Sequence, residues 1–178
     1  MAMQNNILCG SSCVKYILES KNINVDNLNY EMLWITELAN AIFESGIKNV
    51  QLRCFNSNLY NDFIIKKDVD LTFSGFKFLN EILKKGININ VIKMDLKSFQ
   101  KELLENEYII LCVKSNIFNN SDNMDGGHFI IVNNEILGNK IKIINPIKDK
   151  YEEKYMTIKE LIKCCKNYGS WRLLIKED

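Results

Sequence analysis

The chain carries one histidine, His128, and six cysteines, of which Cys9 stands at the start of a predicted helix. A thiol at a helix N-terminus faces the positive end of the helix dipole and several unpaired backbone N–H groups, which favour the thiolate. The dipole contributes only about 0.3–2 kcal/mol, whereas a cation ~4 Å away contributes about 4 kcal/mol at an effective dielectric near 20. Cys9 therefore needs a cationic partner to be a strong nucleophile, and an imidazolium can be that partner.

His128 follows two glycines and begins the apolar run HFIIV, which predicts a buried strand that holds the imidazole at its start. A general base also needs a third group that accepts a hydrogen bond from its second ring nitrogen. Asn145 is our candidate, because it ends the next predicted strand, and the start and end of two hairpin strands are neighbours. Asp125 and Asp149 are the alternatives for this role.

Two further residues, Gln4 and Cys13, bear on the role of the Cys9 thiol. Gln4 lies a few positions before Cys9, where its side-chain amide can join the Cys9 backbone N–H in stabilising an oxyanion. Losing such a donor typically costs about 100- to 1000-fold in rate. Cys13 lies one helical turn after Cys9 and is the alternative nucleophile, although a residue inside a helix has fewer free N–H groups to offer an anion.

The other site classes have weaker signals. A zinc site would have to combine Cys9, Cys13 and His128 with one of the cysteines at 164 and 165, and the chain has no Cys-x-x-Cys pair. The glycines form neither a P-loop nor a dinucleotide fingerprint. We therefore predict no metal and no organic cofactor.

These residues must be positioned by an early helix and by strands in the last third of the chain. Helical spacing and capping residues predict helices over residues 9–20, 31–44, 70–85, 95–106 and 157–167, with Asp95 and Thr157 as N-caps and Gly46 after the second helix. Alternating or short apolar runs predict strands over 48–55, 87–93, 108–113 and 171–176, and two more over 128–146, joined by a turn at 138–139. The polar stretch 114–125 predicts a loop. Helices come early and strands late, which indicates an α+β domain with an antiparallel sheet.

Composition limits the possible partners. With 178 residues and no repeat or linker, residues 1–178 are expected to form a single domain. A formal charge of +1 is no large positive excess, and the sequence contains no Arg-rich arm or basic amphipathic helix that would favour nucleic acid. No segment approaches the ~20 apolar residues that span a bilayer. Without an apolar export signal, we expect a cytoplasmic protein whose cysteines are free thiols. The sequence predicts no oligomeric state.

Several motifs in order resemble a known family. Gln4 before Cys-Gly-x-x-Cys at a helix start, then Gly-His-Phe-Ile-Ile-Val, then a strand ending in Asn-Pro resemble the papain-like superfamily, in particular its bacteriocin leader-processing peptidases. The segments WITEL at 34–38, SGI at 45–47 and the late KNYGSWRLLI resemble the guanylyl cyclase domain-containing protein family, which has the same papain-like pattern. This likeness covers nearly the whole chain.

The resemblance implies a papain-like cysteine peptidase fold, in which N-terminal helices pack against a C-terminal antiparallel sheet. It implies Cys9 as nucleophile, His128 as general base, Asn145 as orienting residue and Gln4 as oxyanion donor. The implied activity is that of a cysteine hydrolase, a peptidase or amidase, with a peptide or protein substrate. Two alternatives stay open: a guanylyl cyclase producing cyclic GMP, from the family's name, and an inactive binding module, from Leu8 where the family usually has Asp.

Overall fold

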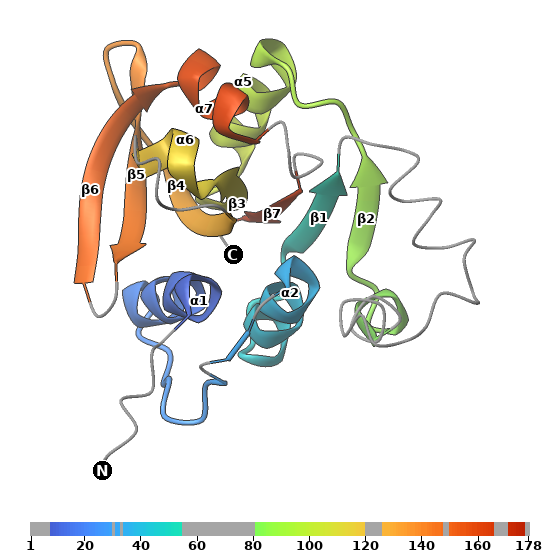
Figure 1. The fold of residues 1–178 in the computed structure, drawn as a ribbon. Helices are drawn as coiled ribbons and strands as arrows, with labels where there is room; N and C mark the ends of the chain where they lie inside the picture. Colours follow the sequence, from blue (N-terminus) through green and yellow to red (C-terminus); the bar gives the residue numbers. More distant parts are fainter. Residues whose placement is uncertain are drawn as a thin grey trace.

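The computed structural model describes residues 8–29, 31–32, 34–54, 81–119, 126–147, 150–165 and 171–176 of the chain. In these residues seven strands form one mixed sheet, in the order β2-β1-β7-β3-β4-β5-β6, with helices on both faces (Figure 1). The helices are α1 (Cys9–Ser20), α2 (Ile35–Glu44), α5 (Leu96–Glu105), α6 (Ser115–Asn119) and α7 (Ile158–Cys165). The strands are β1 (Val50–Cys54), β2 (Asn88–Val91), β3 (Tyr108–Lys114), β4 (Gly127–Leu137), β5 (Lys140–Ile147), β6 (Lys150–Thr157) and β7 (Arg172–Ile175). The α+β class is confirmed.

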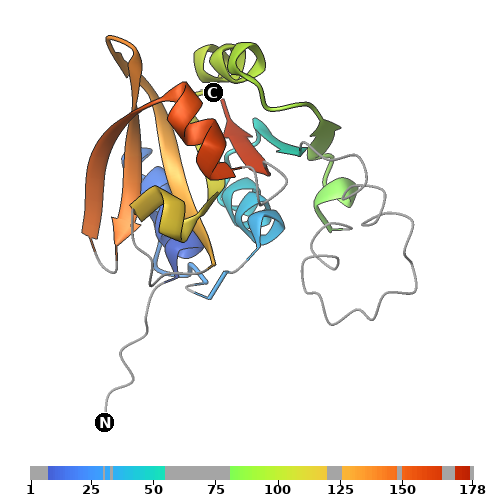
Figure 2. The same cartoon turned by 45° about the horizontal axis from the view of Figure 1, so that its top comes forward.

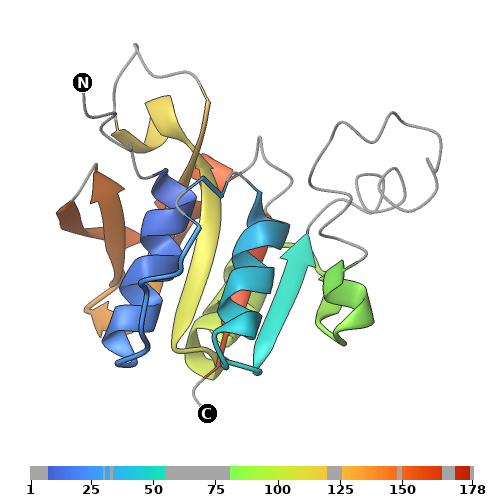
Figure 3. The same cartoon turned by 90° about the horizontal axis from the view of Figure 1, so that it is seen from below.

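One face of the sheet is covered by α1 and α2, which lie side by side (Figure 3). In α1 the spacing of Val14, Ile17 and Leu18 places all three on one stripe, and each is buried in the core beneath the sheet. Helix α1 packs on β4 and β5, and α2 packs on β1 and β7. The expected packing of N-terminal helices on a later sheet is therefore confirmed.

The opposite face is covered by α5 and α7, and Figure 2 shows α7 in front of the strands. Both helices begin at the predicted caps. The Asp95 carboxylate accepts from the Ser98 N–H at 2.9 Å, and the Thr157 hydroxyl accepts from the Glu160 N–H at 3.3 Å. The Glu160 carboxylate accepts in return from the Thr157 N–H at 2.8 Å, which completes the predicted capping box.

The prediction of an antiparallel sheet is wrong for one strand pair. Strand β1 pairs with β2 in parallel, with Gln51 opposite Asn88, whereas the other described pairs are antiparallel. A parallel pair needs a long crossover, and 33 residues, 55–87, separate these two strands. The helix expected over 70–85 falls in that interval; residues 70–80 lie outside the described residues, and residues 81–84 are helical.

Three local predictions are also corrected. The helix expected from residue 31 begins at Ile35, because Trp34 has the extended backbone of an N-cap, with φ −115° and ψ 142°. The polar stretch 114–125 was expected to be a loop, but residues 115–119 of it form α6. Strand β6 was not predicted, because it is an edge strand whose residues are all exposed or partly exposed and show no apolar alternation. The turn at 138–139 is confirmed, with Gly138 at φ +63°.

A buried ionic cluster ties α5 to the centre of the sheet. Arg172 of β7 and Glu102 of α5 are both fully buried, with Arg172 Nε 2.5 Å from Glu102 Oε2 and Nη2 2.6 Å from Oε1. Arg53 of β1 reaches Glu102 Oε1 with Nη1 at 2.7 Å. Two planar guanidinium groups therefore share one carboxylate, in the bidentate geometry that Arg favours. In the part of the chain that is described, no helix is both long enough and apolar enough to pass through a membrane.

Candidate active site

Cys9 is the first residue of α1 and is partly exposed. The residue before it, Leu8, is an N-cap without a side-chain hydrogen bond, and the first turn of the helix contains no acidic residue. The N–H groups of this turn are therefore not taken by a capping carboxylate and can face an anion. The helix start thus has the electrostatics that a thiolate requires.

Gly10 lets the helix start lie close to the sheet. A Cβ atom at this position would lie 3.0 Å from the Met32 carbonyl oxygen, 3.1 Å from a Leu38 methyl group and 3.2 Å from the Phe129 ring. Side chains larger than hydrogen do not fit without movement of these neighbours. The glycine after Cys9 is therefore a requirement of packing, and the Cys9 sulfur lies against β4.

Three donors surround the Cys9 sulfur. The Phe129 backbone N–H donates to Sγ at 3.4 Å, and the Gly10 N–H and the His128 imidazole are further hydrogen-bond partners of the thiol. Burial alone raises the pKa of Cys9, but the hydrogen bond and the charge of His128 and the two backbone N–H groups outweigh it, so the pKa is lowered. This is the direction that a nucleophile needs.

His128 lies between Cys9 and Asn145. Its Nε2 is 2.7 Å from Asn145 Oδ1, and its other partner is the Cys9 thiol. Burial lowers the pKa of His128. The hydrogen bonds to Cys9 and Asn145 and the charge of Cys9 raise it by more, so the pKa is raised overall. The opposite shifts of the two partners favour a thiolate–imidazolium pair.

The hairpin of β4 and β5 brings His128 and Asn145 together, as the sequence predicted. Ile144 lies opposite Ile131, so Asn145 is one residue farther from the turn. It lies toward the open end of the hairpin, where His128 is the second residue of β4. Asn145 is fully buried, and it lies inside β5 rather than at its end, because the strand continues through Pro146. A buried amide must satisfy its hydrogen bonds within the protein, which gives the His128 ring a fixed partner.

Cys13, the alternative nucleophile, differs from Cys9 in its burial and in its pKa. It is fully buried, and burial together with the nearby thiols of Cys9 and Cys112 raises its pKa well above the usual range. Burial and the Cys9 charge likewise raise the pKa of Cys112 to about 12. Both thiols are therefore protonated at neutral pH, and of these three cysteines Cys9 alone has a lowered pKa.

The remaining candidates are outside the described residues. Gln4, Asp125 and Asp149 belong to segments that the structure does not describe, so the oxyanion role of Gln4 and the two alternative orienting groups stay predictions. Among the residues that are described, no group of three or more His, Cys, Asp and Glu side chains could hold a metal ion.

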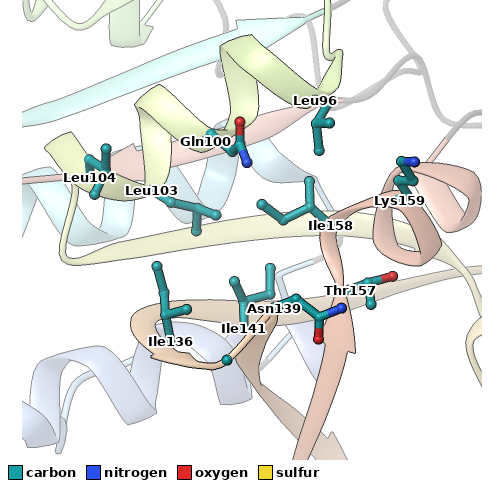
Figure 4. A pocket seen from close by; sticks show the side chains of 11 residues that line it. Leu96, Gln100, Leu103, Leu104, Ile136, Asn139, Ile141, Thr157, Ile158 and Lys159 are labelled. Atoms are coloured by element: carbon teal, nitrogen blue, oxygen red, sulfur yellow. The ribbon is translucent and has the colours of Figure 1, made fainter.

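A pocket of about 590 Å³ lies at the other end of β4 from His128. Figure 4 shows Leu103 and Leu104 of α5 facing Ile136 and Ile141 of the hairpin across this pocket. Its lining includes neither Cys9 nor His128. The pocket is therefore separate from the candidate site, and the chemistry of the site does not depend on it.

Comparison with known proteins adds no relative to these observations: no protein-family model matches the sequence, and the search of curated proteins found no match.

Sequence reasoning missed three side chains around the imidazole. Glu152 of β6 accepts from Asn145 Nδ2 at 3.2 Å, and Lys154 Nζ lies 3.4 Å from the same carboxylate oxygen. Phe118 of α6 places its ring 6.2 Å from that of His128. Since β6 and α6 were not predicted as a strand and a helix, no periodicity pointed to these residues.

Proposed function

We propose that this protein is a papain-like cysteine hydrolase that cleaves a peptide or other amide bond. The observation that carries the proposal is the order Cys9, His128, Asn145, in which one imidazole contacts the thiol through one side and the buried amide through the other. A nucleophile, a base and a group that orients the base are the three parts of such a site. The finer fold assignment, a papain-like fold, belongs to the same proposal.

The ring nitrogens have separate tasks in this mechanism. Asn145 Oδ1 can only accept, so His128 Nε2 carries the hydrogen of the 2.7 Å bond. Nδ1 is then the nitrogen that exchanges a proton with Cys9. Holding Nε2 in this way keeps the imidazole in the tautomer and orientation that general-base catalysis requires.

The reaction proceeds in two steps. The Cys9 thiolate adds to the substrate carbonyl, a sulfur–carbon bond forms, and the carbon–nitrogen bond breaks as the His128 imidazolium gives its proton to the departing amine. Water then enters, His128 takes a proton from it, and the hydroxide adds to the thioester carbonyl. The sulfur–carbon bond breaks, the acid product leaves, and the thiolate–imidazolium pair is restored.

Covalent labelling tests the proposal without knowledge of the substrate. A peptidyl vinyl sulfone should modify the wild-type protein at Cys9, and a mixture of peptides of known sequence should yield new chain ends. Cys9→Ala should abolish both signals, and His128→Ala should abolish turnover. Cys164→Ser is the matched control, because Cys164 is buried in α7 away from the site and its loss should leave both signals unchanged. Labelling or cleavage that persists in Cys9→Ala would remove this mechanism.

A further inference from the structure

The Asn145 side chain could be placed in either of two orientations that differ by half a turn about its terminal bond. In one, Oδ1 faces His128, and in the other Nδ2 faces it. The two have opposite effects on the imidazole, because Oδ1 requires a hydrogen on Nε2 whereas Nδ2 requires a lone pair there. The orientation of a single amide therefore selects the tautomer of the base.

Glu152 is placed to make this selection. It lies directly opposite Asn145 in the pairing of β5 with β6, and its Oε2 accepts from Asn145 Nδ2 at 3.2 Å. An ionised carboxylate has no hydrogen to donate, so it can bind only the Nδ2 side of the amide. Oδ1 is thereby turned toward His128.

The Glu152 carboxylate is itself held in place. Lys154 Nζ lies 3.4 Å from Glu152 Oε2 and 5.1 Å from the centre of the Phe118 ring. Phe118 in turn packs beside His128, with an angle of 34° between the two rings. The contacts thus form a closed circuit of five side chains that includes the imidazole itself: His128, Asn145, Glu152, Lys154 and Phe118.

We propose that Glu152 is a positioning residue, which acts through Asn145 to keep the hydrogen of His128 on Nε2 and so leaves Nδ1 for the Cys9 thiol. The catalytic meaning of this proposal rests on the proposed function. The effect of Glu152 on the tautomer of His128 does not. Because the Glu152 side chain is half exposed, with a relative exposure of 50%, its salt bridge adds little to stability. Its role lies in orientation.

The single histidine of the chain makes the tautomer directly measurable. Nitrogen NMR of the imidazole distinguishes a hydrogen on Nε2 from one on Nδ1, and only one ring contributes. The Cys9→Ser background removes the thiolate, so that the neutral imidazole can be observed at alkaline pH. We expect the Nε2–H tautomer in this background and a mixture of tautomers when Glu152→Leu is added.

Glu152→Gln tests the acceptor-only character of the carboxylate at nearly constant size. The Gln amide can donate to Asn145 Oδ1 as well as accept from Nδ2, so it no longer selects one orientation of Asn145 and should give a mixture of tautomers, as Glu152→Leu does. Glu153→Gln is the matched control on the same strand, since Glu153 pairs with Lys142 at 2.9 Å. It should leave the His128 signals unchanged.

The second measurement uses proteins that retain Cys9. It is the rate of Cys9 alkylation by iodoacetamide at pH values below neutrality. The charged or titratable groups around His128 in the described residues are Cys9 of α1, Cys112 of β3, and Glu152 and Lys154 of β6. Loss of one hydrogen bond in this network should slow alkylation by about 2- to 10-fold in Glu152→Leu. Glu152→Gln should also slow alkylation, and Glu153→Gln should stay close to the wild-type rate.

The outcomes are distinguishable. A single Nε2–H tautomer in Glu152→Leu or in Glu152→Gln would overturn the positioning role, and so would an effect of equal size in Glu153→Gln, since loss of charge alone would then explain it. A mixed tautomer in both Glu152 variants, with Glu153→Gln like the wild type, supports it. The tautomer reading does not depend on catalysis, so it holds even if the wild-type thiol proves unreactive and the proposed function fails.

Discussion

Removal of the Glu102 carboxylate should destabilise the fold while leaving the candidate site intact. Glu102 and Arg172 are fully buried and form a bidentate pair, and Arg53 shares the same carboxylate. Glu102→Gln has nearly the same size but replaces one oxygen with an amide nitrogen. That nitrogen must face a guanidinium group, which also has only donors.

The expected cost follows from the burial of the charge. Breaking a buried pair by removing one partner leaves the other charge without compensation and typically costs about 3–5 kcal/mol. This is a large part of the total stability of a domain, which is about 5–15 kcal/mol. For a chain of this length, the melting temperature should fall by about 6–20 °C, at about 2–4 °C for each kcal/mol.

Urea unfolding followed by circular dichroism measures this loss. Glu105→Gln is the matched control, because Glu105 lies on the same helix with a side chain 39% exposed and pairs with Lys101 at 3.6 Å. Its effect should stay within about 0.5 kcal/mol. The folded Glu102→Gln protein should be alkylated at Cys9 by iodoacetamide as fast as the wild type. A free energy of unfolding within about 1 kcal/mol of the wild type would refute the claim that this pair is buried and paired in solution.

Three further predictions concern the site. Cys9→Ala should lower the pKa of His128, because burial lowers it and the hydrogen bond and charge of Cys9 are among the effects that raise it; proton NMR titration of the single imidazole checks this. Asn145→Ala should also lower the pKa of His128, but less than Cys9→Ala, because Asn145 contributes a hydrogen bond without a charge; an unchanged pKa would contradict the 2.7 Å contact. Gly10→Ala should cost about 0.5–2 kcal/mol, since close contacts of about 1–3 kcal/mol exceed the gain of about 0.5–1 kcal/mol from Ala in a helix. The Met32 carbonyl at 3.0 Å cannot rotate away, so Cys9 alkylation should slow as well, and an equally stable, equally reactive variant would show that the helix start is not packed so closely.

The sequence predicted the elements whose residues have a strong local signal. The apolar stripe of α1, the caps of α5 and α7 and the turn at Gly138 all depend on short-range spacing or on a residue type that the backbone needs. The approach of His128 to Asn145 was predictable for the same reason, since two adjacent strands and a tight turn leave little freedom of pairing.

The rest depended on long-range pairing. Nothing local to β1 or β2 shows that they run parallel, because that orientation is set by the path of the chain between them. Strand β6 lies at the edge of the sheet and its residues are exposed or partly exposed, so no apolar pattern placed Glu152 and Lys154. The Glu102–Arg172 pair joins residues 70 positions apart, and charged residues are rarely fully buried.

The central claim is that His128 activates Cys9, and the pH dependence of alkylation tests it most directly. Iodoacetamide is added over a range of pH, and mass spectrometry measures the rate at each of the six cysteines. Because the pKa of Cys9 is lowered, its thiolate should persist to lower pH than an ordinary thiol, so Cys9 should react first and its rate should fall only below the usual thiol range. His128→Ala should move that fall to higher pH. A Cys9 that reacts no faster than the other thiols, or a profile that His128→Ala leaves unchanged, would contradict the account.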